Sequence, residues 1–313
     1  MNKKFNFTTF TPAGGNGAKV FDTDYLDQMK EELLGKIVLE GKTIDWAYLI
    51  PGVKNRISLN GIGDITSVVD AACGWDVKGD IELVQKELKV FAKQIKNAIC
   101  PKDLEKTYLG MYMKTNKEIP FIGVIAEQYV KVAKKEVEKL IWQGDGSSMD
   151  GIYKEADGDT NVVDASALVD AAATWIDRVN AMISQTPAEV LERTDGVLVM
   201  GYADFMAYVQ ELQGQANMTV SFNDPSNMSF YIPGTNILCR ATAGMDGLAA
   251  PTKGRNMILT YEENVVVGTD MMDDEEVFDI WYSRDNDEVR VNVQFKIGST
   301  YRWSEYLVKG YAI

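Results

Sequence analysis

The stretch PFIGVIAEQYVKVAKKEVEKLIWQ, residues 120–143, limits the fold of this chain more than any other feature. Its apolar residues recur every three or four positions, which is the spacing of one helix face. About 22 helical residues at roughly 1.5 Å each give a rod of about 33 Å, which is long for a compact enzyme domain and suits a structural spine. The predicted buried stripe is Ile122, Ile125, Tyr129, Val132, Glu136 and Leu140, and the residues predicted to face solvent are Lys131, Lys134, Lys135, Glu138 and Lys139.

The helix runs into IWQGDGSSMDGIY, residues 141–153, a loop rich in glycine, aspartate and serine. A metal site, a phosphate cradle and a plain turn are the three interpretations of such a loop. A calcium loop that starts at Asp145 fails at its third ligand position, which Met149 occupies. We therefore predict a turn that ends the helix, with Gly144 in the left-handed conformation as its cap.

A second calcium candidate lies just downstream. Asp157, Asp159 and Asn161 match the first three ligand positions of such a loop. Val162 stands where the loop needs glycine, and Leu168 stands where a bidentate glutamate should close it. We predict no metal site here.

Composition argues for a globular chain without membrane-spanning segments. The 313 residues exceed one typical core and predict two structural domains. No apolar run approaches the roughly 20 residues of a membrane span. The opening MNKKFNFTTFTPAGGNG lacks the continuous apolar core of a secretory signal, so we predict an extended arm at the amino terminus.

The residue counts exclude several classes of chemistry. Histidine is absent, which removes the commonest general base and makes a Ser-His-Asp triad impossible. Cys73, Cys100 and Cys239 lie far apart without CxxC spacing, so neither a zinc site nor a disulfide framework is expected, and a reducing compartment is the default. A net charge of −14 disfavours tight binding to nucleic acid.

The nucleotide motifs fail as well. GGNGAKV lacks the Gly-Lys-Ser/Thr ending of a phosphate loop, GVLVMGYADF lacks GxGxxG spacing, and no GxSxG elbow is present. Lys54 and Lys78 could reach a neighbouring chain, but solvated lysines are the favoured interpretation. A solvated loop is likewise favoured over a cation site for the acidic cluster Asp270, Asp273, Asp274, Glu275, Glu276 and Asp279. We expect no catalytic, cofactor-binding or metal-binding residues.

The remaining patterns predict a mixed α+β chain. A helix is expected over residues 22–41, and a glycine-rich, two-stranded excursion follows at 50–80. Its right-hand limb, residues 81–95, fits helical and strand periods equally well. Beyond it we expect a helix over 164–184 through Leu168, Ala172, Trp175, Val179 and Met182, a buried strand GVLVMG, a helix through Phe205, Val209 and Leu212, strands from Met257 onward, and a hairpin tip at 284–287.

In this order the elements resemble the major capsid proteins of tailed bacteriophages with the Hong Kong 97 fold. The passages that carry the resemblance are KEVEKLIWQGDGSSMDGIYK, GVLVMGYADFMAYVQEL, SFYIPGTNILCRA and NVQFKIGSTYRWSEYLVKGYAI. It covers most of residues 45–313 and favours strands for the right-hand limb. The division it implies is an amino-terminal arm at 1–45, an extended β loop at 46–95, a peripheral domain with the spine helix at 96–158 and 275–304, and an axial domain at 159–274 and 305–313.

The resemblance also implies a function. The chain would assemble, through pentamers and hexamers of itself, into the icosahedral head shell of a double-stranded DNA phage, inside the host bacterial cytoplasm. It would enclose the DNA without specific binding, and it would meet a portal and decoration proteins in the virion. The short arm leaves no room for a fused scaffolding segment, so a separate scaffolding protein is expected. No cross-link between subunits can be assigned to residues of this chain.

Two alternatives stay open at this point. An encapsulin-type bacterial compartment would keep the fold and house a cargo enzyme, although the arm NFTTFTPAGGNG, where an encapsulin would have a helix, favours the phage hypothesis. A calcium-dependent binding or hydrolytic protein would use the acidic loops, and its melting temperature would rise with calcium.

Overall fold

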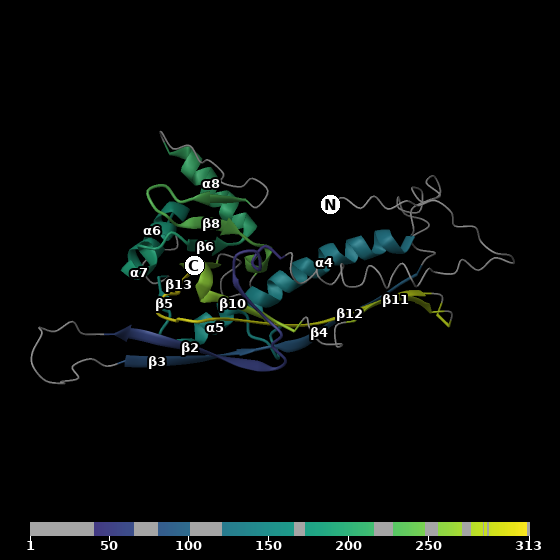
Figure 1. Cartoon of the computed structure of the whole chain (residues 1–313). Coiled ribbons are helices and arrows are strands. Elements are labelled where there is room, and N and C mark those ends of the chain that lie inside the picture. Colours follow the sequence, from purple (N-terminus) through teal and green to yellow (C-terminus); the bar gives the residue numbers. More distant parts are fainter. Residues whose placement is uncertain are drawn as a thin grey trace, which may run out of the picture.

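A computed structural model describes residues 41–65, 81–100, 121–165, 173–215, 228–247, 256–270, 277–283, 285–286 and 288–311. Within these ranges the chain is a mixed α+β protein built on three sheets, as predicted. The helix predicted over residues 22–41 falls outside the described residues, apart from its last position. Figure 1 shows an elongated molecule in which α4 and β11 extend to one side and the β2–β3 ribbon to the other.

The first sheet is centred on a 14-residue strand, β12. β10 and β11 pair antiparallel with successive halves of one edge of β12, and β4 pairs antiparallel with the opposite edge. β1 adds to β10 in parallel. The strands are β1 (Tyr48–Pro51), β4 (Phe91–Ile99), β10 (Val265–Thr269), β11 (Val277–Ser283) and β12 (Glu288–Tyr301).

Alternation along β12 places every second side chain in the first core, as its sequence pattern predicts. Val291, Val293, Phe295 and Ile297 are all buried there because successive side chains of a strand point to opposite faces. β11 and β12 form the predicted hairpin, with Ser283 opposite Glu288.

Helix α4 (Phe121–Gln143) covers this core, and the predicted stripe is right only in part: Tyr129 and Leu140 pack against the core, and the side chains of Ile122 and Ile125 are not described. Val132 is 59 % exposed and Glu136 is also exposed, whereas Glu138, predicted to face solvent, is only 5 % exposed. The buried face runs through Val130, Ala133, Val137 and Ile141, one position along from the predicted stripe. One position turns the helix by about 100°. The prediction was wrong at Val132 and Glu136, and it was wrong for Glu138 because this glutamate was taken to be solvated.

Glu138 is buried because its carboxylate binds three protein donors. The Thr43 N–H donates to Oε1 at 2.8 Å, and the Thr43 hydroxyl donates to Oε2 at 2.6 Å. The Thr242 hydroxyl donates to the same Oε2 at 2.8 Å, while the Trp142 indole N–H donates to the Thr43 hydroxyl at 2.8 Å. This carboxylate therefore joins the start of the described chain, α4 and the segment before the 3-10 turn η2 (Ala243–Met245).

The second sheet has the order β5-β13-β9-β6-β8-β7 and encloses a core of its own. The predicted strand GVLVMG is its fully buried β6, and Phe205, Val209 and Leu212 are buried on α8 as predicted. The elements are β5 (Val163–Asp164), α6 (Trp175–Gln185), α7 (Ala188–Leu191), β6 (Gly196–Met200), α8 (Tyr202–Gly214), β7 (Ser229–Tyr231), β8 (Leu238–Ala241), β9 (Asn256–Tyr261) and β13 (Val308–Tyr311).

Helix α6 begins later than the sequence predicts. Thr174 caps it, and a reciprocal capping box with Asp177 fixes its start. Val179 and Met182 are buried as predicted and Trp175 packs against the same core. Leu168 and Ala172 lie outside the described residues. A local cap therefore decided the boundary that periodicity had placed about ten residues earlier.

Strand pairing places some residues differently from the sequence-based division. Residues 265–269, assigned there to the axial domain, form β10 and pair with β1 and β12, and Val265 and Val267 are buried in the first core. β1, assigned to the extended loop, lies in the same sheet. Periodicity identifies a strand but not the sheet it joins, so these placements needed the long-range pairing.

The loop after α4 is the predicted turn. Gly144 has φ +71°, and its N–H donates to the Leu140 carbonyl at 3.0 Å. The Asp145 carboxylate accepts the N–H groups of Ser147, Ser148 and Met149 at 2.9 Å each, and it also pairs with Lys93 of β4. The Lys93 ammonium and these N–H groups hold the pKa of Asp145 well below its usual range. The chain then enters α5 (Ile152–Gly158).

Replacing Glu138 should destabilise the subunit, because its donors would stay buried without an acceptor. We expect Glu138→Leu to lower the free energy of unfolding by about 3 kcal/mol and Glu138→Gln, which keeps one acceptor oxygen, by about 1 kcal/mol. Urea denaturation of the purified subunit measures both values. Glu136→Gln is the matched control, since this exposed residue forms only an i,i+3 pair with Lys139, and its effect should stay below about 0.5 kcal/mol. Equal effects at positions 136 and 138 would refute the role of the buried carboxylate.

Candidate assembly site at the root of the hairpin

The strand interpretation of residues 81–95 is confirmed. β2 (Arg56–Ile65) and β3 (Ile81–Lys89) pair antiparallel from Arg56 opposite Lys89 outward, and β4 follows β3 after Val90. No other strand in the described part of the chain pairs with either of them. The ribbon therefore has two open strand edges, and Figure 1 shows it projecting away from the body. We call this ribbon the hairpin.

Apolar contacts hold the inner end of the hairpin against the first sheet. Leu88 is fully buried, and Val90 is 5 % exposed. The close fit requires glycine on the facing strand: a Cβ on Gly268 would lie 2.7 Å from Leu88 Cδ2. A Cβ on Gly298 would likewise lie 2.0 Å from the Lys89 carbonyl oxygen. The inner end of the hairpin is thus packed as tightly as core.

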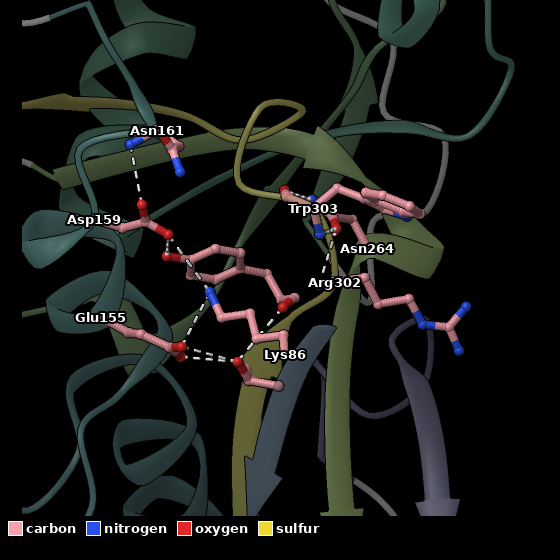
Figure 2. Close-up of polar contacts among 9 residues, drawn as sticks. Lys86, Glu155, Asp159, Asn161, Asn264, Arg302 and Trp303 are labelled. Carbon is pink, nitrogen blue, oxygen red and sulfur yellow. Dashed lines mark hydrogen bonds and ion pairs between the residues drawn. The ribbon is translucent and has the colours of Figure 1, made fainter. Parts of the chain in front are cut away.

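Polar contacts hold the hairpin at Lys86, two residues from Leu88 toward the outer end of β3. The Lys86 ammonium lies 3.1 Å from Glu155 Oε1 and 3.7 Å from Asp159 Oδ2. It also lies 3.1 Å from the centroid of the Tyr301 ring, in a cation–π contact. Figure 2 shows Lys86 pointing toward the two carboxylates. We call Lys86, Glu155, Asp159 and Tyr301 the root cluster.

The two carboxylates are themselves fixed by the end of β12. The Thr300 hydroxyl lies 2.9 and 3.0 Å from the two oxygens of Glu155. The Tyr301 hydroxyl donates to Asp159 Oδ2 at 2.9 Å, and the Asn161 N–H donates to Asp159 Oδ1 at 3.0 Å. Lys86 therefore meets a site whose geometry is set by neighbouring groups (Figure 2).

The pKa shifts in the root cluster differ in direction. Burial lowers the pKa of Lys86, and the charges of Glu155 and Asp159 oppose this only in part. Burial would raise the pKa of Asp159, but the hydrogen bonds from the Asn161 N–H, Tyr301 and Ser304, together with the charge of Lys86, outweigh it and leave that pKa below its usual value. Burial and the bond to Asp159 raise the pKa of Tyr301. Desolvation thus lowers the pKa of Lys86 more than the two neighbouring carboxylates raise it.

A third contact lies on the other strand of the ribbon. Gly61 of β2 sits against the indole of Trp303, where an added Cβ would be 2.2 Å from Cη2. The backbone of Trp303 is held by Asn264, whose Oδ1 accepts its N–H at 2.8 Å and whose Nδ2 donates to its carbonyl at 3.0 Å (Figure 2). Gly61, which has no side chain, lets the ribbon approach this ring closely.

The acidic positions singled out in the sequence have protein partners where they are described. The Asp157 carboxylate accepts a hydrogen bond from the Lys309 ammonium at 2.8 Å, and Asp159 belongs to the root cluster. Asp270 is 2 % exposed and pairs with Lys296 at 3.2 Å, so its interpretation as a solvated residue was wrong. Asp273, Asp274, Glu275 and Glu276 lie outside the described residues, as does Lys78, and the side chain of Asp279 is not described.

Among the described residues, no group of three or more His, Cys, Asp or Glu side chains could hold a metal ion. Cys239 is buried, and burial raises the pKa of its thiol. Cys100 is also a free thiol, and Cys73 lies outside the described residues. Of the described helices, none is both long and apolar enough to cross a membrane.

Filling the space at Gly61 should weaken the seat of the hairpin. We expect Gly61→Val to overlap the Trp303 ring, at a cost of about 1–3 kcal/mol, and to speed hydrogen exchange of the β2 and β3 amides. Mass spectrometry of the exchanging subunit measures this. Gly214→Ala is the control, since no atom lies within 4 Å of a Cβ added there. Unchanged exchange in Gly61→Val would contradict the contact.

Comparisons of sequence identify no relative. No protein-family model matches the chain, and no curated protein matches it.

Comparisons of structure give a consistent result. A chain of the satellite phage P4 procapsid including the size determination (Sid) protein matches with a TM-score of 0.59 and 13 % identity, covering 96 % of this chain and 94 % of that one. Mycobacterium phage Ogopogo gives 0.56 and 8 % identity over 86 % and 91 % of the two chains. The capsid of cyanophage P-SCSP1u gives 0.50 and 10 % identity over 88 % of each. The chain has the fold of phage capsid proteins.

Proposed function

We propose that this chain is the major capsid protein of a tailed double-stranded DNA bacteriophage. The observation that carries the proposal is the hairpin, a projecting ribbon with two open edges and a rigid root, on a chain with a capsid fold. An isolated two-stranded ribbon contributes little to the stability of its own subunit. Its length and open edges suit contact with a neighbouring subunit.

The proposed parts follow the division implied by the sequence. Residues 1–45 act as the arm and 46–95 as the extended loop. The peripheral domain comprises 96–158 and 275–304, and the axial domain 159–274 and 305–313. β1 and β10, which this division assigns to the loop and to the axial domain, lie in one sheet with β12, which it assigns to the peripheral domain.

Open strand edges provide the proposed mechanism of assembly. Unpaired N–H and C=O groups on β2 and β3 can pair with another chain, which is a hazard in a monomer and an advantage in a shell. Each subunit would reach its neighbours through both the arm and the hairpin, so individually modest contacts become multivalent. These contacts have to exceed the repulsion between copies of net charge −14.

The proposed partners are other copies of the chain, arranged as pentamers and hexamers in the virion shell. A separate scaffolding protein, a portal and decoration proteins complete the proposed assembly, which forms in the host bacterial cytoplasm. The enclosed DNA is not bound specifically, because an acidic chain repels phosphate and leaves a packaged genome free to exit.

Removing the outer part of the hairpin should abolish shell closure without unfolding the subunit. The variant replaces residues 62–83 by Asn-Gly and so keeps Gly61, Lys86 and Leu88. We expect the wild-type chain, expressed with its scaffold, to form uniform shells under negative-stain microscopy. The variant should give the same circular dichroism spectrum and no closed particles. Closed shells from the variant, or a wild-type chain that stays monomeric at high concentration with scaffold, would refute the proposal.

The contents of purified particles separate phage from compartment. A phage capsid isolated from infected cells should contain nuclease-protected double-stranded DNA. An encapsulin-type shell would contain a single protein cargo instead, visible by gel electrophoresis and mass spectrometry, and that result would replace the phage proposal.

A further inference from the structure

Lys86 differs from the other described charged residues of the hairpin. Its side chain is 18 % exposed, whereas those of Arg56 and Lys89 are 67 % and 59 % exposed. Glu87, the next residue of β3, is 43 % exposed. Surface charges on a ribbon are ordinarily solvated, so a lysine drawn into the body against the cost of desolvation calls for a specific reason.

The position of Lys86 along β3 supplies that reason. Lys86 and Leu88 are two residues apart, so both side chains point toward the body. Leu88 packs against the smooth surface of Gly268 in a contact without angular preference. On its own, such a contact would allow the strand to pivot. A second attachment about 7 Å along the strand fixes a direction.

Among the described side chains around this point, the root cluster supplies the directional contacts. The ammonium of Lys86 lies between carboxylates from α5 and the loop after it, with the Tyr301 ring of β12 as its third neighbour. The energy of an ion pair depends on the distance between its charges, and a cation–π contact needs the cation over the ring face, whereas apolar contact sets no such preference. The contact of Gly61 with Trp303 is apolar.

We propose that Lys86 is the positioning residue of the hairpin: its contacts with Glu155, Asp159 and Tyr301 set the direction in which the ribbon leaves the body. The inference rests on the proposed function, in which this direction decides whether the ribbon meets the neighbouring subunit. Lys86 acts through geometry, and its contribution to the stability of the fold is small.

The balance of charge and burial separates positioning from stability. Replacing a buried ion pair by an apolar side chain of similar volume is often neutral for folding. The lowered pKa of Lys86 also indicates that loss of its ion pairs has little effect on the stability of the fold. Because the unfolded chain binds the Lys86 proton more tightly, loss of this proton at alkaline pH does not destabilise the fold. It does remove the ion pairs. Direction and stability should therefore respond differently to pH.

The pH window follows from the two shifted groups. The pKa of Asp159 lies below its ordinary value, so its pairing is complete at neutral pH and is lost only as the pH falls through that lowered pKa. At the other end, pairing is lost as the pH rises through the lowered pKa of Lys86. Among the described residues, Glu155 and Tyr301 are the other titratable groups that face the ammonium. We expect a fixed hairpin between these limits and a mobile one outside them.

Distance measurement in the unassembled subunit tests the proposal. Spin labels are placed on Asp64→Cys, in the outer part of β2, and Glu189→Cys, exposed on α7, with Cys73 and Cys100 replaced by serine. Pulsed electron spin resonance should give one narrow distance distribution at pH 7. Lys86→Met should broaden it at least two-fold, while its melting temperature stays within a few degrees of the parent.

Matched variants make the result specific. Lys86→Arg keeps a cation and should restore the narrow distribution, and it should also move the alkaline limit to higher pH, because arginine holds its proton more tightly. Lys89→Met removes an exposed lysine of the same strand and should leave the distribution narrow. The proposal is overturned if Lys86→Met stays narrow, if Lys89→Met broadens equally, or if Lys86→Arg fails to restore the parent distribution.

Assembly of the same variants distinguishes failure of this inference from failure of the proposed function. Wild-type and Lys86→Arg subunits should form closed shells, and Lys86→Met subunits should form at least ten-fold fewer. If Lys86→Met broadens the distances yet assembles normally, the direction of the ribbon is irrelevant to shell formation and the inference fails. If the wild type forms no shells while the distances behave as expected, the function fails and the role of Lys86 as positioning residue stands.

Discussion

The buried carboxylate of Glu138 is the interaction on which the rest of this structure depends. It accepts hydrogen bonds from Thr43 and Thr242, which lie far apart in the sequence, and it does so from near the carboxyl end of α4. A buried charge is costly unless it is fully hydrogen-bonded. One of the donors here, Thr242, lies between β8 of the second sheet and the turn η2, whose Met245 packs in the first core. The two sheets therefore form one frame, from which the hairpin projects.

Local geometry explains which elements the sequence could predict. The alternation of β12, the left-handed turn at Gly144 and the buried strand β6 each follow from a few neighbouring residues, and each is confirmed. The error in α4 arose from contacts between residues that are distant in the sequence. A stripe through Val132 and Glu136 is reasonable only if Glu138 is solvated, and nothing near Glu138 in sequence shows that Thr43 and Thr242 will neutralise the cost of burying it. The limb at 81–95 stayed ambiguous for the same reason, because pairing with β2 and β12 decides it.

The root cluster shows a harder limit of sequence reasoning. Lys86, Glu155, Asp159 and Tyr301 form no motif, since three separate parts of the chain contribute them. Asp159 attracted notice for its spacing from Asp157 and Asn161, which resembles a calcium loop. The structure gives its oxygens to Tyr301, Asn161 and Lys86 instead. The spacing of acidic residues in the sequence identifies possible metal ligands. It does not show which cations and hydroxyl groups of distant strands will bind those residues in the folded chain.

A partly buried ion pair is a poor way to stabilise a fold, and this explains why it suits the root of the hairpin. Apolar packing by Leu88 and Val90 already attaches the ribbon, and a further apolar residue at position 86 would strengthen the attachment without fixing an angle. A lysine between two oriented carboxylates loses free energy on desolvation but has few acceptable geometries. In the proposed shell, many weak contacts add only if each subunit presents them at the same angle. A subunit that assembles through a projecting hairpin therefore gains more from a fixed hairpin direction than from a more stable attachment of the hairpin to its own body.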